Sequence, residues 1–97
     1  MLDALTKEDW TKQLNESFYI QIGNTDKYPI KLIDVSGYGR SMGGSREAYS
    51  LLFSGPKMPI LPQNIYSVNN SAFGALDIFL VPIGPQADGM GYEAVFT

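Results

Sequence analysis

Reactive side chains are few in this 97-residue chain, and their types limit the chemistry that it could perform. It contains no His and no Cys. A zinc site of the usual kind, a thiolate nucleophile and a Ser-His-Asp triad all require those residues. Ser50 and Ser54 lie in neither a G-x-S-x-G turn nor an S-x-x-K pattern, so neither is assigned as a nucleophile. We expect no cofactor and no metal site.

Three carboxylates fall inside segments that have the pattern of strands: Asp34, Asp77 and Glu93. Two converging carboxylates could act as acid and base in the manner of glycosidases. The sequence does not show whether they converge, and outward-facing positions on three strands account for all of them. We therefore expect that the protein is not an enzyme, and a carboxylate enzyme ranks third among the functions considered.

A glycine-rich segment, Gly37–Gly44 (GYGRSMGG), invites comparison with phosphate-binding loops, because backbone N–H groups freed by glycine can cradle anions. Its spacing fits neither G-x-x-x-x-G-K-[ST] nor a G-x-G-x-x-G that opens a helix. We expect a mobile loop, either a plain connection or one that orders on a partner. In the second case Tyr38, Arg40 and Met42 are its contact residues.

The charge balance and the apolar runs narrow the range of partners. Seven Lys plus Arg stand against ten Asp plus Glu, for a net charge of -3. A duplex nucleic-acid binder needs several cations on one face, so we expect no nucleic-acid partner. The longest apolar run, residues 78–83, falls far short of the roughly 20 residues that span a bilayer, and no basic-then-apolar leader opens the chain. We expect a cytoplasmic protein without a membrane partner.

The first element that could position side chains is a short helix. Thr6 and Asp9 have the spacing of a capping box, and Leu5 and Trp10 that of a hydrophobic staple. These signals predict an amphipathic helix over residues 7–15. A helix this short is marginal in water, so it should lie against the rest of the protein, plugging one end of a sheet or barrel.

Six strands follow, predicted at residues 18–22, 30–35, 47–53, 64–69, 75–81 and 92–96 from period-two alternation between turn residues. In the second strand the apolar face switches after Leu32, which predicts a bulge there or a strand covered on both faces. The fifth strand is apolar on both faces, so it should be central or covered twice. Residues 56–62 and 82–85 are expected as connections, because proline lacks the N–H of a strand ladder.

These elements predict a mainly β fold, a small six-stranded antiparallel barrel with one N-terminal amphipathic helix. Closure is favoured because an open sheet of six strands would leave two polar edges exposed. A two-sheet sandwich is the alternative. The chain is expected to be one domain, 1–97, with residues 1–16 as the capping helix and 17–97 as the barrel.

Twelve per cent of the residues are aromatic, more rings than a core of this size needs. Seven have strand or helix positions that predict burial: Trp10, Phe18, Tyr49, Phe53, Tyr66, Phe79 and Phe96. Four others could join Met42, Met58 and Ile60 in an apolar patch for protein contact: Tyr19, Tyr28, Tyr38 and Phe73. Scattered surface aromatics are the alternative.

Five segments together resemble a family of small bacterial domains of about 100 residues that has no known function: residues 53–56 (FSGP), 61–66 (LPQNIY), 79–84 (FLVPIG), 92–96 (YEAVF) and the Leu5-x-x-x-x-Trp10 stretch. The resemblance covers nearly the whole chain and rests on Gly, Pro and apolar residues, so it implies a scaffold and transfers no activity. It implies at most an accessory or assembly role beside phage-tail-like or tail-collar proteins.

The sequence therefore favours a non-enzymatic module that binds another protein or itself. Its expected contact residues are Tyr38, Arg40, Met42, Met58 and Ile60, from the glycine-rich and proline-rich connections. The alternative is a barrel that binds a small molecule or glycan, lined by Tyr49, Tyr66 and Tyr92.

Overall fold

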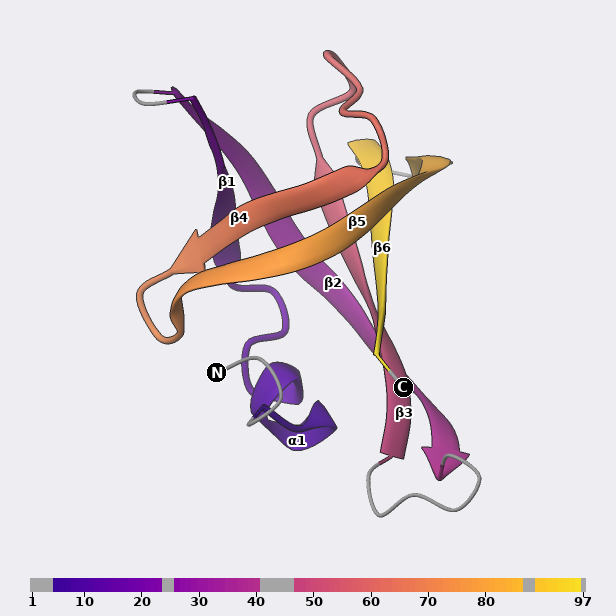
Figure 1. Cartoon of the computed structure of the whole chain (residues 1–97). Helices are drawn as coiled ribbons and strands as arrows, with labels where there is room; N and C mark the ends of the chain where they lie inside the picture. Colours follow the sequence, from indigo (N-terminus) through magenta and orange to yellow (C-terminus); the bar gives the residue numbers. More distant parts are fainter. Residues whose placement is uncertain (1–4, 24–25, 41–46, 87–88, 97) are drawn as a thin grey trace.

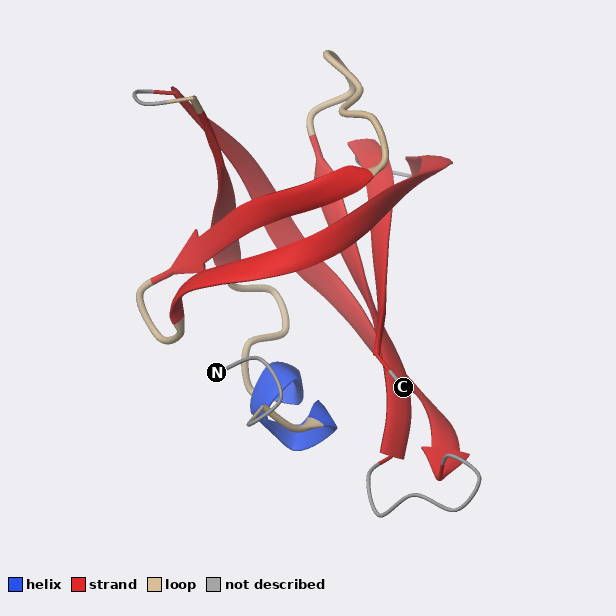
Figure 2. Ribbon diagram, in the orientation of Figure 1, coloured by secondary structure: helices blue, strands red, loops and turns tan. Residues whose placement is uncertain are grey.

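A closed six-stranded antiparallel barrel makes up most of the computed structural model (Figures 1 and 2). The structure describes residues 5–23, 26–40, 47–86 and 89–96, without the side chains of residues 38–40 and 47–48. The strand order around the barrel is β1-β2-β3-β6-β5-β4, which confirms the barrel and not the sandwich. The strands are β1 (Ser17–Ile22), β2 (Asp26–Arg40), β3 (Glu47–Gly55), β4 (Asn64–Asn70), β5 (Gly74–Gln86) and β6 (Gly89–Phe96).

The helix α1 (Lys7–Thr11) begins as the sequence predicts but ends earlier. The Thr6 hydroxyl accepts from the Asp9 N–H at 3.2 Å, and the Asp9 carboxylate accepts from the Thr6 N–H at 3.0 Å, so the capping box is complete. The prediction that the helix continues to Asn15 is wrong. Asn15 has a left-handed backbone, which asparagine tolerates, and its N–H leaves the helix to donate to the Leu32 carbonyl at 2.7 Å. Among the described residues, no helix has the length and apolar character to cross a membrane.

The strand β2 is much longer than the sequence predicts. The pairs Leu32↔Phe53 and Asp34↔Leu52 skip Ile33, which confirms the predicted bulge. The expectation of a loop from Gly37 is wrong as far as Arg40, because these residues pair with β3; residues 41–44 lie outside the described part. Ladder hydrogen bonds come from the backbone, so a strand partner outweighs the weak strand preference of glycine.

The strand β5 runs through the residues that were expected to form the last connection, 82–85, and this prediction is wrong. The strand β4 begins opposite Leu80, so beyond that point β5 pairs only with β6. Prolines are tolerated on such an edge. A bulge between Pro82 and Gly84 is accommodated by Gly84, whose φ of 111° favours glycine.

The core lies inside the barrel, and α1 closes one end of it (Figure 1). Trp10 is fully buried, edge-on to Phe73 at 5.0 Å between ring centroids and stacked near Phe18 at 6.0 Å. The helix therefore plugs the barrel as predicted. The other buried apolar residues come from all six strands: Phe18, Ile20, Tyr28, Ile30, Leu32, Tyr49, Leu51, Phe53, Val68, Leu76, Ile78, Leu80, Met90, Tyr92 and Ala94.

Three aromatic residues do not lie where their positions in the sequence predict. Phe79 faces outward and is 49% exposed, because Leu76, Ile78 and Leu80 set the inward face of β5. Tyr28 is buried, since β2 begins early enough to place it on the same face as Ile30. Phe73 packs against Trp10. The patch predicted from Tyr19, Tyr28, Tyr38 and Phe73 is therefore wrong for Tyr28 and Phe73.

Candidate functional site

The end of the barrel opposite α1 is covered by residues 56–63, which join β3 to β4 and are named here the proline segment (Figures 1 and 2). Three tyrosine hydroxyls hold its backbone. The Tyr28 hydroxyl donates to the Pro59 carbonyl at 2.6 Å, and the Tyr92 hydroxyl accepts from the Leu61 N–H at 2.9 Å. The Tyr66 hydroxyl donates to the Pro62 carbonyl. The segment is thus fixed by side chains from β2, β4 and β6.

Two of these hydroxyls are in contact with each other. The Tyr28 and Tyr92 hydroxyl oxygens are 3.3 Å apart. Burial, followed by the hydrogen bond with Tyr92, raises the pKa of the Tyr28 hydroxyl well above its ordinary value. Burial also raises the pKa of Tyr66. Both hydroxyls therefore keep their protons at neutral pH and remain hydrogen-bond donors to the proline segment.

The proline segment presents two apolar side chains to solvent. Met58 is 75% exposed and Ile60 is 52% exposed. Leu61, the next residue, turns inward and packs on the core, so the backbone cannot rotate freely. These are two of the five predicted contact residues, and the structure places them together on a held backbone.

Two of the other three predicted contact residues, Tyr38 and Arg40, belong by their backbone to a different part of the molecule. Tyr38 and Arg40 lie in β2 near its far end, where Arg40 pairs with Glu47 at the start of β3. Their side chains, and all of Met42, lie outside the described part. The strand β3 separates the backbones of Tyr38 and Arg40 from the proline segment by roughly 25 Å, at about 3.3 Å per residue. The backbones of Tyr38 and Arg40 therefore lie apart from Met58 and Ile60, and the contact role of the five residues stays a prediction.

A second apolar area lies on the outer face of β4 and β5. Ile65 is 63% exposed and is paired directly with Phe79. Ile83, further along β5, and Val95 of β6 are also exposed. Sequence reasoning did not select Ile65 or Phe79 as surface residues, although the apolar character of both faces of β5 was a signal for them.

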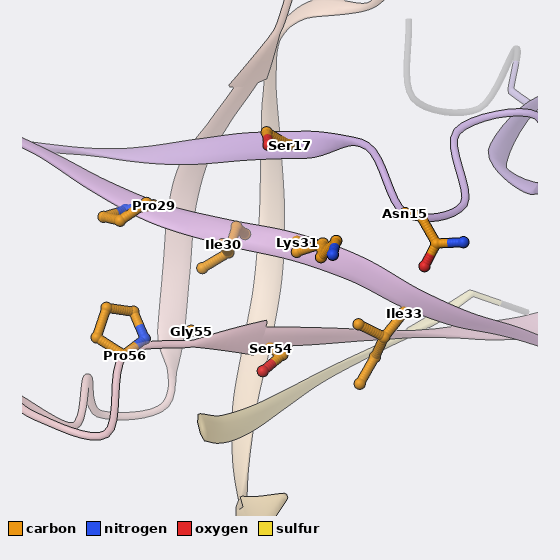
Figure 3. Close-up of a pocket in the computed structure, with 9 residues that line it drawn as sticks. All are labelled: Asn15, Ser17, Pro29, Ile30, Lys31, Ile33, Ser54, Gly55 and Pro56. Atoms are coloured by element: carbon orange, nitrogen blue, oxygen red, sulfur yellow. The ribbon is translucent and has the colours of Figure 1, made fainter. Parts of the chain in front are cut away.

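A groove of about 700 Å³ crosses the outer face of β1, β2 and β3 (Figure 3). Its centre is a cross-strand row in which Lys31 pairs with Ser17 on one side and with Ser54 on the other. Asn15 and Ile33 lie toward one end, and Pro29 and Pro56 toward the other (Figure 3). Sequence reasoning missed this groove, because its residues are far apart in the chain and carry no local pattern.

The three carboxylates do not gather in the structure. Asp34 is exposed and accepts a hydrogen bond from the Ser36 hydroxyl at 2.8 Å. Leu52 separates Asp34 from Glu93 across β3, and Asp77 is paired with Ser67 of β4. Among the described residues, no three His, Cys, Asp or Glu side chains lie where they could hold a metal ion.

The tyrosines proposed to line a ligand cavity serve other contacts. Tyr49 and Tyr92 are buried in the core, where Tyr49 packs 5.1 Å from Phe96, and Tyr66 binds Pro62. None of the three lines the groove of Figure 3. Binding of a small molecule or glycan stays a prediction.

Comparisons with known proteins place the chain in a family. Searches of curated proteins and of solved structures found no match. The resemblance to a small domain of unknown function is confirmed: the family model described as Domain of unknown function (DUF6916) matches residues 5–96, and the chain belongs to this family.

Proposed function

We propose that this domain is a protein-binding module whose contact surface is the proline segment. The observation that supports the proposal is the exposure of Met58 and Ile60 on a backbone held by the hydroxyls of Tyr28, Tyr66 and Tyr92. The partner is either another protein or a second copy of the chain.

Two physical effects make this surface suited to binding. Covering exposed apolar side chains gains about 25 cal/mol for each Å² removed from water. Ordering a flexible loop would reduce that gain, but a segment already held in place loses little conformational entropy on association. Methionine adds a side chain that adapts to irregular partner surfaces.

The apolar area extends along the chain from the proline segment into β4. Ile65 lies two residues beyond the segment and is paired with Phe79 on β5. A partner seated on Ile60 could therefore also cover the Ile65–Phe79 pair. An accessory role beside a phage-tail-like or tail-collar protein is one form of this proposal, and it depends on the identity of the partner.

The test compares the unchanged protein with a Met58→Ser, Ile60→Ser double variant. A Val95→Ser variant is the control, because Val95 is also exposed but pairs with Ser50 of β3, five residues away from the Gly55 end of that strand where the proline segment begins. Light scattering at several concentrations measures self-association. Affinity capture from the source cells, repeated with the purified captured protein, measures binding to another protein.

The proposal expects a partner that the unchanged protein and the control bind and that the double variant loses. All three proteins should unfold at similar temperatures, since the changed side chains are exposed. A protein that stays monomeric and captures nothing, or a double variant that binds as well as the control, would overturn the proposal.

A further inference from the structure

The groove on the outer face of β1, β2 and β3 brings together four polar side chains: Asn15, Ser17, Lys31 and Ser54 (Figure 3). Among the described residues, none of these side chains has a hydrogen-bond or ion-pair partner. Three of them belong to one cross-strand row, with the lysine between the two serines. Cross-strand neighbours have Cβ atoms about 5 Å apart, so each serine hydroxyl can share a ligand group with the Lys31 ammonium, and the whole row can contact one extended ligand.

The chemistry of these groups favours an anion. The lysine ammonium carries a full positive charge and three donors, and each serine hydroxyl and the asparagine amide adds donors. Hydrogen bonds from a charged donor to a carboxylate are about twice as strong as those between neutral groups. The residues that line the groove include no carboxylate, although the chain as a whole is acidic.

Apolar side chains flank Lys31 along the groove, and they suit an extended chain better than a free ion. Pro29 and Pro56 lie at one end, and Ile33 lies toward the other, on either side of Lys31 (Figure 3). The groove crosses three strands and leaves room for residues on both sides of a carboxylate. Pro56 is also the first residue of the proline segment, so the groove continues the proposed contact surface.

We propose that the groove binds an extended acidic segment of the protein partner. An Asp or Glu carboxylate of that segment accepts from the Lys31 ammonium and from one of the two flanking hydroxyls, Ser17 or Ser54, and the other hydroxyl donates to a backbone carbonyl of the segment. Its neighbouring apolar residues pack on Pro29, Pro56 and Ile33. This inference rests on the proposed function and adds a second contact of defined chemistry.

The probe is a library of random 12-residue peptides displayed on yeast and selected against the purified domain. The proposal expects the selected peptides to carry an Asp or Glu with apolar neighbours. A synthetic copy of a selected peptide should bind Lys31→Gln roughly tenfold or more weakly, given the strength of hydrogen bonds to charged groups. Its binding should also weaken as salt concentration rises.

Lys27→Gln is the matched control, because Lys27 is in the same strand, lies over the Tyr19 ring and does not line the groove. It should bind the peptide within about twofold of the unchanged protein. Lys31→Arg should keep most of the binding, and a Ser17→Ala, Ser54→Ala double variant should lose part of it. Unfolding curves of each variant show that the fold is intact.

The outcomes separate this inference from the proposed function. A library that yields no acidic peptides, or Lys31→Gln binding as well as Lys27→Gln, overturns the acidic-segment site. If the Met58, Ile60 double variant alone loses the peptides, the proline segment binds and the groove does not. If Lys31→Gln alone loses them, the groove binds the peptide, and the role of the proline segment is decided by the partner-binding test of the Met58, Ile60 double variant.

Discussion

Tyr28 of β2 and Tyr92 of β6 meet edge to face, with their ring centroids 6.5 Å apart and their planes at 89°. Their hydroxyls touch, and together they connect the Leu61 N–H to the Pro59 carbonyl. Since only β3 lies between these two strands in the barrel, this contact ties β2 to β6 across β3, next to the proline segment.

Removing the Tyr92 hydroxyl should loosen the proline segment. In Tyr92→Phe the partly buried Leu61 N–H has no acceptor, and the free energy of unfolding should fall by about 1 to 3 kcal/mol. Urea denaturation measures the loss, and hydrogen exchange should quicken at Leu61. Tyr19→Phe is the control and should change stability by less than about 0.5 kcal/mol. Equal effects of the two substitutions would contradict the role of Tyr92.

Stability should fall at high pH because of Tyr28. Its pKa is raised in the folded protein, so the unfolded chain loses this proton first, near pH 10. The contribution of the protonated Tyr28 hydroxyl to the free energy of unfolding is fully present below pH 10. It is lost as pH rises from there toward the pKa of the folded state, at up to about 1.4 kcal/mol per pH unit. Urea midpoints between pH 8 and 11 should decline less steeply in Tyr28→Phe. Parallel declines would refute the prediction.

Trp10 should contribute strongly to stability through the plug that it forms. Trp10→Ala removes a fully buried ring from contact with Phe18, Phe73 and Phe96, and should destabilise the fold by about 3 to 5 kcal/mol. Trp10→Phe should lose less, because among the described residues the Trp10 indole N–H is buried without a hydrogen-bond partner. Thermal unfolding followed by circular dichroism measures both. A loss below about 1 kcal/mol for Trp10→Ala would mean that the helix does not close the core.

Two glycines of β6 should differ sharply when changed to alanine. A Cβ at Gly89 would lie 2.0 Å from the Gly55 carbonyl oxygen, whereas at Gly91 the nearest atom is the Gln86 Cγ at 2.7 Å. Backbone cannot move aside as a flexible side chain can, so Gly89→Ala should lose at least about 2 kcal/mol and Gly91→Ala clearly less. Urea denaturation of both variants shows which of them loses more free energy of unfolding. The reverse order would show that the β3–β6 pairing at Gly55 is looser than the structure has it.

Features that depend on neighbouring residues were predictable from the sequence. The capping box needs only Thr6 and Asp9, three residues apart, and the bulge beside Leu32 follows from a switch in alternation over four residues. The number of strands and the closed barrel also followed, because alternation marks strands and unpaired edges favour closure. The exposure of Met58 and Ile60 followed from the prolines around them.

Features that depend on pairing between distant residues were decided only by the tertiary structure. Gly37–Arg40 and Pro82–Pro85 became strand because β3 and β6 lie beside them, which local preference does not reveal. Tyr28 and Tyr92 are 64 residues apart and meet only when the barrel closes. The row of Ser17, Lys31 and Ser54 likewise requires the register of three strands. Short-range patterns determine which segments form strands, whereas the pairing of those strands determines which side chains share a surface.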